Sequence, residues 1–257
     1  MTTEVVVLIG VGLYLVLMIG IGAYSSRKTH TLAEFILAGR RLPPLVLTTT
    51  IIATWFGGGT VMGSSGASYE DGLLGVVADP FGAALCLLLV GLFFARLFRR
   101  LKLLTFIDFV DQRYGKVAVI VTAVSSIVSN VGWVGGMLVA FGLLFESLTG
   151  VPLEVGILCG AAVVIISTAV GGLWAVALTD FIQMVIVIVG LGILLTVVLI
   201  DVGGFSAVAA AVPDGTFRLL PRENTSEQWL NYLRMWVIFG IADIASQTLT
   251  QRALAAR

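Results

Sequence analysis

Three acidic side chains lie inside long apolar stretches of this sequence: Asp79, Asp180 and Asp243. A carboxylate at the depth of lipid hydrocarbon is costly unless water or a polar partner stabilises it, so such a group is a candidate for holding an ion or a polar solute. Simpler roles stay open for two of them. Asp79 could be a structural partner near the outer interface, and Asp180 could cap the start of a helix, where the helix dipole favours negative charge.

Three consecutive glycines, Gly57, Gly58 and Gly59, occur in the apolar segment 51–63. Each glycine weakens a helix by about 1 kcal/mol relative to alanine, so a helix break is expected here. Unwound backbone in a bilayer is tolerated where it lines a cavity, and its free carbonyls could then hold an ion or a polar solute. The glycines could equally serve close helix packing.

A second interruption is predicted in a short apolar segment near the end of the chain, which contains Gly240, Asp243, Ser246 and Gln247. Two tryptophans also lie away from the membrane surfaces, where tryptophan is usually enriched: Trp55 precedes the glycine run, and Trp133 is central in its apolar stretch. An aromatic face would suit a cationic or apolar solute. Ordinary helix packing is the alternative for both rings.

The sequence contains few residues that could support other kinds of chemistry. His30 is the only histidine, and Cys86 and Cys159 both lie in apolar runs, so neither a histidine-based catalytic site nor a disulfide framework is indicated. The 15 Lys and Arg balance the 15 Asp and Glu, which gives no nucleic-acid footprint. No nucleophile elbow or phosphate-binding loop is present, so we do not expect an enzyme.

The elements that must position these residues are membrane helices. Hydrophobic residues make up 58% of the chain and charged residues 12%, and the mean hydropathy is +1.07. About 20 apolar residues are needed to cross a bilayer. The sequence predicts an all-α membrane protein with about seven such spans, at residues 5–24, 44–68, 73–95, 117–145, 155–174, 181–200 and about 232–250.

Lysine and arginine gather in alternate connections, which the positive-inside rule assigns to the cytoplasm. One group comprises Arg27, Lys28, Arg40 and Arg41; the next comprises Arg96, Arg99, Arg100, Lys102, Arg113 and Lys116. We therefore expect the amino terminus outside the cell membrane and Arg257 inside. The chain ends in a segment of helical character, so we expect the protein to continue beyond it.

The two interrupted spans are the second and the seventh, and the predicted orientation makes them cross in opposite directions. An inverted five-helix repeat requires this relation, with the two broken helices meeting near the membrane midplane.

Several motifs resemble the amino-terminal half of the sodium:solute symporters. These are Phe35-Ile-Leu-Ala-Gly-Arg40, Arg113-Tyr-Gly115, Gly203-Gly-Phe205, Gly171-Gly-Leu-Trp-Ala-Val-Ala-Leu-Thr-Asp-Phe-Ile-Gln183 and Gln251-Arg-Ala-Leu-Ala-Ala256. The resemblance implies a partial leucine-transporter-like inverted-repeat core. Its parts would be an extra amino-terminal helix and basic cytoplasmic loop at 1–43, the first five-helix repeat at 44–200, an extracellular loop at 201–231, and the first helix of the second repeat at 232–257.

The resemblance also implies site residues. Ala53 and Phe56 would offer backbone carbonyls to sodium at the break of the second span, and Asp180 would lie on the cytoplasmic sodium exit path. Within the family, the residues around the glycine run and Trp133 look most like the high-affinity choline transporters. Two further aromatic positions of the choline cage are Ala83 and Ser246 here, so the solute stays open.

We therefore expect sodium-coupled symport of a small organic solute by alternating access. The solute would bind beside Trp55, Gly58, Thr60, Trp133, Asp243 and Gln247. The expected partners are the solute, the lipid bilayer and the carboxy-terminal half of the transporter. Two alternatives are a symporter-like sensor domain of a signalling protein and a fragment without transport activity of its own.

Overall fold

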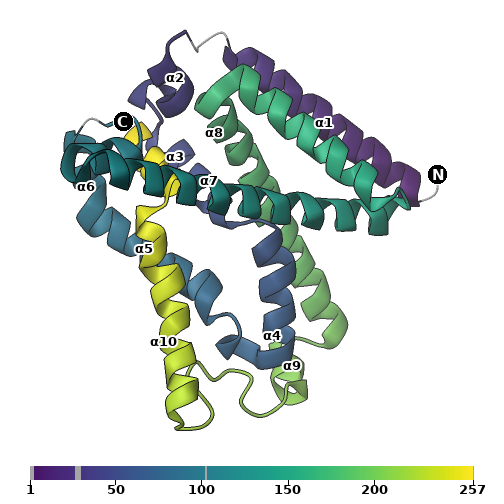
Figure 1. Ribbon diagram of the computed structural model, residues 1–257. Helices are drawn as coiled ribbons and strands as arrows, with labels where there is room; N and C mark the ends of the chain where they lie inside the picture. The colour runs from purple at the N-terminus through teal and green to yellow at the C-terminus, as the bar shows by residue number, and fades with distance from the viewer. Residues whose placement is uncertain (1–2, 27–29, 102, 257) are drawn as a thin grey trace.

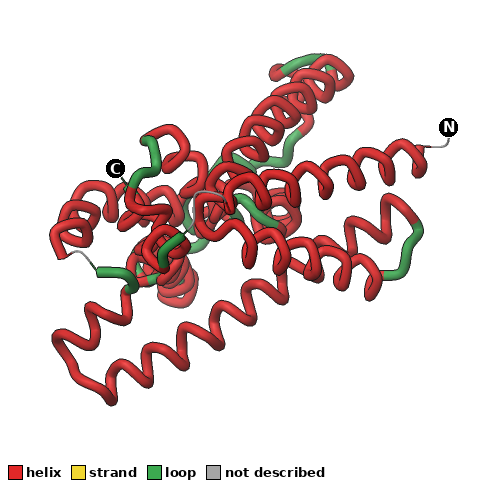
Figure 2. The backbone as a smooth tube through the Cα atoms, turned by 90° about the horizontal axis from the view of Figure 1, so that it is seen from above, coloured by secondary structure: helices red, strands yellow, loops and turns green. Residues whose placement is uncertain are grey.

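The computed structural model describes residues 3–26, 30–101 and 103–256, and nearly all of them are helical (Figure 2). The described chain contains no strand, only one parallel bridge between Leu42 and Ala256. The helices are α1 Thr3–Ser26, α2 Leu32–Leu37, α3 Pro44–Trp55, α4 Ser65–Asp71, α5 Ala83–Leu89, α6 Ala95–Leu101, α7 Phe106–Thr149, α8 Leu153–Val202, α9 Phe205–Ala211, α10 Ser226–Gly240 and α11 Gln247–Ala255.

The second predicted span is broken, as expected. Helix α3 ends at Trp55, and Phe56 leaves the helical conformation with φ −77° and ψ 86°. The chain resumes as a π-helical turn, Gly59–Ser64, which leads into α4. The two parts of the span are bent by 59°.

The third predicted span is assembled from several pieces between Val77 and Leu101. It begins with a π-helical turn, Val77–Gly82, in which Asp79 has an extended backbone (φ −137°, ψ 114°). Helices α5 and α6 follow, joined by another π-helical turn, Val90–Phe94. Asp79 therefore precedes the regular part of the span.

Helix α8 is 50 residues long and carries two of the predicted spans. It is folded at Gly172, whose φ of +59° and ψ of −159° separate two arms that diverge in Figure 1. The first arm runs along α1 and the second leads down to α9 (Figure 1). A β-carbon at residue 172 would lie 2.7 Å from the carbonyl oxygen of Phe35, so this close turn requires glycine.

This fold corrects the predicted boundary between the fifth and sixth spans. The second arm begins at Leu173 rather than near Phe181, so Asp180 lies about two turns inside a helix. The idea that Asp180 caps a helix start is wrong, because the free N–H groups of a helix occur only in its first turn. Its carboxylate needs partners from other elements.

Helix α7 also starts earlier than expected, at Phe106 rather than near Val117, with a non-helical residue at Gly115 (φ +79°, ψ −179°). Thr105 and Asp108 form a reciprocal capping box at its start. The same arrangement starts α2, where the backbone N–H groups of His30 and Thr31 donate to Glu34. These bonds, that from His30 foremost, lower the pKa of the Glu34 carboxyl below its usual value.

The seventh predicted span is interrupted as well. Helix α10 ends at Gly240, a 3₁₀ turn covers Ala242–Ala245, and α11 restarts at Gln247 with Ser246 as its capping residue.

Four helices among the described residues are long and apolar enough to cross a membrane, or five when the bent pair of the second span counts as one. Because α8 has the length of two crossings, these account for six predicted spans. The seventh consists of α10 and α11, with 15 and 9 residues, each too short to cross alone.

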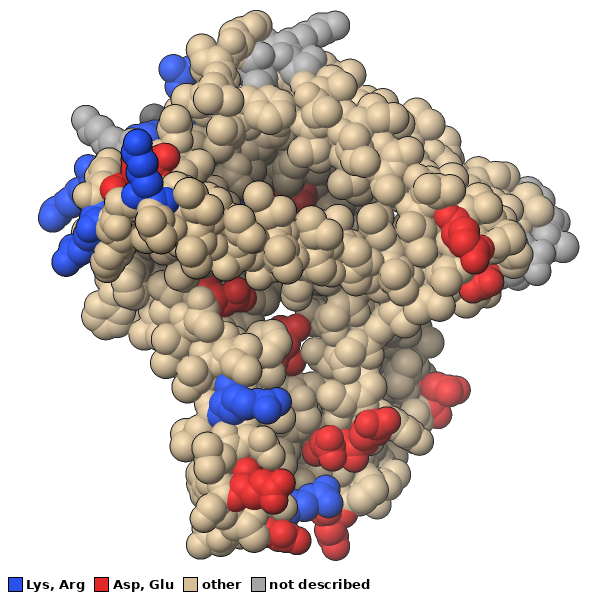
Figure 3. Space-filling view, in the orientation of Figure 1, with Lys and Arg blue, Asp and Glu red and all other residues tan. Residues whose placement is uncertain are grey.

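The predicted cytoplasmic connections meet at one end of the molecule. Leu37, Phe98, Leu103, Ala253 and Leu254 form one buried cluster there, and Gln251 donates to the carbonyl of Ile36. Most lysine and arginine side chains of the visible face gather at this end (Figure 3). Arg27, Lys28, Lys102 and Arg257 lie outside the described residues.

Candidate functional site

The two broken spans meet around Cys86 of α5. Its fully buried side chain forms a cluster with Val90 and Leu249, and Trp55 and Ile244 pack against that cluster. Trp55 is the last residue of α3, and Ile244 lies in the turn between α10 and α11. The meeting of the two interruptions, expected from their opposite orientations and the inverted-repeat relation, is therefore present.

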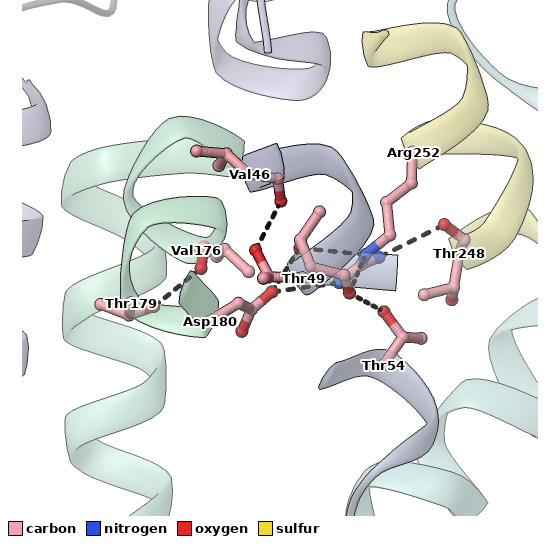
Figure 4. Close-up of polar contacts among 9 residues, drawn as sticks. Val46, Thr49, Thr54, Val176, Thr179, Asp180, Thr248 and Arg252 are labelled. Carbon is pink, nitrogen blue, oxygen red and sulfur yellow. Dashed lines mark hydrogen bonds and ion pairs between the residues drawn. The ribbon is translucent and has the colours of Figure 1, made fainter. Parts of the chain in front are cut away.

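On the basic side of this junction, three side chains form a buried polar chain: Thr50 of α3, Asp180 of α8 and Arg252 of α11 (Figure 4). The Thr50 hydroxyl donates to Asp180 and accepts from Arg252 Nε at 3.3 Å. Arg252 Nε also donates to the Thr50 carbonyl at 3.1 Å, and its Nη2 lies 3.9 Å from the Asp180 carboxylate.

Burial makes these contacts important. Thr50 is 0% exposed and Arg252 8% exposed. A buried charge without a partner is strongly destabilising, so each ion depends on the other and on the hydroxyl between them. The chain connects three elements, α3, the second arm of α8, and α11. Sequence reasoning singled out Asp180 but missed Thr50 and Arg252.

The predicted sodium ligands Ala53 and Phe56 lie directly beyond this cluster along the chain. Ala53 is in the last turn of α3, where helix carbonyls lack an intrahelical partner, and Phe56 is at the break itself. Within that turn, the hydroxyl of Thr54 donates to the Thr50 carbonyl at 2.7 Å. Thr54, next to the break, is thus hydrogen-bonded to Thr50 of the polar chain.

The glycine run lies at the helix break and also allows close helix packing. A β-carbon at Gly57 would lie 2.7 Å from Met137 Sδ, and one at Gly58 would lie 2.6 Å from Ala140 Cβ, so both glycines allow close contact with α7. Gly59 has open space around it. Trp133 lies one helical turn before Met137 on α7 and is half exposed.

Beyond the break, Thr60 and Asp79 are in contact. The Thr60 hydroxyl oxygen lies 2.7 Å from Asp79 Oδ2 and 2.8 Å from the carbonyl oxygen of Trp55. The segment holding Asp79 packs against α10, since a β-carbon at Gly82 would lie 2.9 Å from Phe239 Cβ.

Two further predicted solute ligands, Asp243 and Gln247, lie at the second break. Asp243 is in the 3₁₀ turn of the second break and is half-buried. Gln247 accepts a hydrogen bond from the backbone of Phe106 at 2.9 Å, so its side chain is engaged at the start of α7. The proposed roles of both stay predictions.

A cavity of about 380 Å³ lies on the other side of Asp180, between α1, α7 and the two arms of α8. Its lining is mainly apolar, with a polar corner formed by Tyr14, Thr179, Asp180 and Gln183. Gln183 donates to the Tyr14 hydroxyl. The Asp180 carboxylate therefore lies between a closed polar chain and an open cavity.

Known proteins share this sequence pattern. Residues 35–257 match the model of the sodium:solute symporter family. The high-affinity choline transporter 1 of Caenorhabditis elegans is 30% identical over 195 residues, which is 72% of this chain and 34% of that protein. The human high affinity choline transporter 1 is 33% identical over 70% of this chain and 32% of its own length. The Escherichia coli sodium/pantothenate symporter is 32% identical over 75% of this chain and 41% of its own length.

A solved structure is similar as well. It is the substrate-bound outward-open state of a sodium-coupled sialic acid symporter, which this chain matches with a TM-score of 0.81 and 23% identity over 100% of this chain and 55% of that one. This likeness confirms an all-α, leucine-transporter-like fold. The chain spans about a third of the length of the choline transporters that it matches. The match over residues 35–257, together with these helices, shows that the chain is a multi-pass membrane protein of the sodium:solute symporter family.

Proposed function

We propose that the chain forms the amino-terminal half of a transporter that moves a small organic solute across the cell membrane together with sodium. The buried Thr50–Asp180–Arg252 chain is the observation that carries the proposal. Sodium would enter at the break beside the carbonyls of Ala53 and Phe56, and Asp180 would receive it on the way to the cytoplasm. A carboxy-terminal half would complete the ion and solute sites.

The polar chain explains how an ion could control the inner side. While Arg252 neutralises Asp180, it holds α11 against α3 and α8 and keeps the basic end closed. A sodium ion at Asp180 supplies an alternative positive charge, so Arg252 is no longer needed there and α11 can separate. Ion binding and opening are then linked by one coupling free energy, which acts equally in both directions.

The energy available is sufficient for accumulation. Moving one sodium ion inward down a 100 mV potential supplies about 2.3 kcal/mol, before any concentration gradient is counted. That free energy corresponds to a solute gradient of about 50-fold. The charge distribution favours the amino terminus outside and residue 257 in the cytoplasm.

The test uses the transporter that contains this chain, purified and reconstituted in proteoliposomes. We expect saturable binding of ²²Na⁺ that falls at least about tenfold in Asp180→Asn, and uptake of labelled choline, proline or pantothenate only with an inward sodium gradient. Asp201→Asn, an exposed carboxylate near the end of the same helix, is the matched control and should bind sodium normally. Uptake that is unchanged when potassium replaces sodium would refute the proposal.

A further inference from the structure

Thr50 and Thr60 lie on either side of the first break, and both hydroxyls contact an aspartate from another span. Their hydrogen-bond balance differs. At Thr50 the hydroxyl has an acceptor, Asp180, and a donor, Arg252 Nε, so its one proton and its lone pairs are both used. The Thr50 site is complete without any further ligand.

At Thr60 acceptors exceed donors. The hydroxyl oxygen lies within hydrogen-bond distance of two acceptors, Asp79 Oδ2 and the Trp55 carbonyl, but it has one proton to give. If the Thr60 hydroxyl donates its proton to one acceptor, the lone pairs of the other acceptor face the lone pairs of the hydroxyl oxygen. Three oxygens from the second and third spans thus share a single proton, and a group that brings additional N–H donors would satisfy them.

Among the described residues, no cation meets this need. Arg252 forms an ion pair with Asp180, whereas no described lysine or arginine nitrogen lies within 4.0 Å of the Asp79 carboxylate. Asp79 is half-buried, and Thr60 lies just past the open position at Gly59. The Asp79 carboxylate is therefore partly exposed beside the first break.

We propose that Asp79, Thr60 and the Trp55 carbonyl bind the ammonium group of the transported solute, which is therefore a primary or secondary amine. This inference rests on the proposed symport function and names its substrate class. A protonated amine supplies both a positive charge to pair with the Asp79 carboxylate and two or more N–H donors for the three oxygens. A quaternary ammonium has no N–H group and would leave the oxygens unsatisfied.

The position also connects the solute to the second break. The turn that holds Asp79 packs against the end of α10 through Gly82, whose Cα has room for Phe239 only because it carries no side chain. An amine bound to both Asp79 and Thr60 would fix this turn beside α10. Solute binding would then stabilise the same junction at which sodium enters.

The experiment measures currents from proteoliposomes on a solid-supported membrane at fixed sodium, on addition of ethanolamine, putrescine, proline, choline or ethylene glycol. We expect wild-type responses to one or more of the three N–H amines, a weaker response or none to choline, and none to ethylene glycol. Asp79→Asn should raise the half-saturating amine concentration about 10- to 100-fold, as expected for the loss of a charge-assisted hydrogen bond. Thr60→Val should weaken the response, and Thr60→Ser should restore it.

The controls separate this inference from symport itself. Binding of ²²Na⁺ should be unchanged in Asp79→Asn, and Asp71→Asn, an exposed carboxylate in α4, should leave amine responses unchanged. Loss of sodium binding in Asp79→Asn would show that Asp79 is an ion ligand and overturn the inference. Normal sodium binding without any amine response, or amine affinity retained in Asp79→Asn, would overturn it while leaving sodium coupling intact.

Discussion

Thr50 and Thr250 are both buried threonines, but their hydroxyls have different surroundings. Thr50 connects Asp180 with Arg252, whereas the Thr250 hydroxyl has no hydrogen-bond partner among the described residues. Removing a hydroxyl that serves buried charges leaves them poorly solvated, while removing an unpaired one relieves a burial cost. Two chemically identical substitutions should therefore have different results.

We predict that Thr50→Val lowers the free energy of unfolding of the purified transporter by about 1–3 kcal/mol. Thr250→Val should be neutral or slightly stabilising, because valine has nearly the same shape and no unmet polar group. Thermal denaturation in detergent measures both. Equal losses in the two variants would mean that packing at these positions, rather than the polar chain, determines their stability.

The limits of sequence reasoning are clear at the same residues. Thr50 is the last of three consecutive threonines in an apolar helix, and the hydroxyls of Thr48 and Thr49 bond back to their own helix. Nothing local distinguishes the third, whose partners lie 130 and 202 positions away. Arg252 was visible only as part of a terminal motif. Contacts of such long range follow from the fold and not from spacing along the chain.

At the scale of elements, the glycine run combines a helix break with close packing. Gly58 adopts ordinary helical angles (φ −56°, ψ −34°), so alanine would meet no backbone strain there, only Ala140 of α7. A β-carbon added at Gly59, the next residue, would have no atom within 4 Å beyond its chain neighbours and its own helix backbone. Substituting Gly58 and Gly59 one at a time therefore distinguishes a requirement for close packing from a requirement for a flexible backbone.

We predict that Gly58→Ala destabilises the transporter by about 1–3 kcal/mol, because the added methyl group must push α7 away from the break. Gly59→Ala should be neutral or gain up to about 1 kcal/mol of helix stability. Thermal denaturation and ²²Na⁺ binding check both variants. If Gly59→Ala were as harmful as Gly58→Ala, the requirement would be for flexible backbone.

Both breaks could be predicted because glycine and polar residues inside apolar spans are conspicuous in a sequence. The fold of α8 was harder to place. Gly171 and Gly172 were visible as part of a motif, but the turn depends on their contacts with Gly22 and Phe35, which only the packed structure supplies. The predicted boundary was therefore several residues late, and Asp180 was assigned to a helix start.

For the whole molecule, the charge pattern predicts an orientation. The basic connections gather at one end with α11, while the segment between α9 and α10 lies at the other (Figures 1 and 3). Arg113 is exposed at the basic end, and Asp214 is exposed in the segment between α9 and α10. Their accessibility from each side of the membrane can be compared in one experiment.

We predict that a cysteine at Asp214 is labelled by a membrane-impermeant maleimide in intact cells, whereas a cysteine at Arg113 is labelled only after permeabilisation. Both substitutions are made in a background with Cys86→Ser and Cys159→Ser, so that the two native thiols of this chain do not contribute. The reverse pattern would place the amino terminus in the cytoplasm and exclude the proposed direction of sodium entry.

The native thiol of Cys86 has a further consequence. It is fully enclosed at the point where both interrupted spans touch, whereas Cys159 is exposed. Alkylation requires a thiolate and therefore water, so Cys86 should react with N-ethylmaleimide only during moments when the junction is hydrated. In the Cys159→Ser variant, its modification rate at different sodium and solute concentrations would measure how often the transport cycle passes through a hydrated state, without an engineered cysteine.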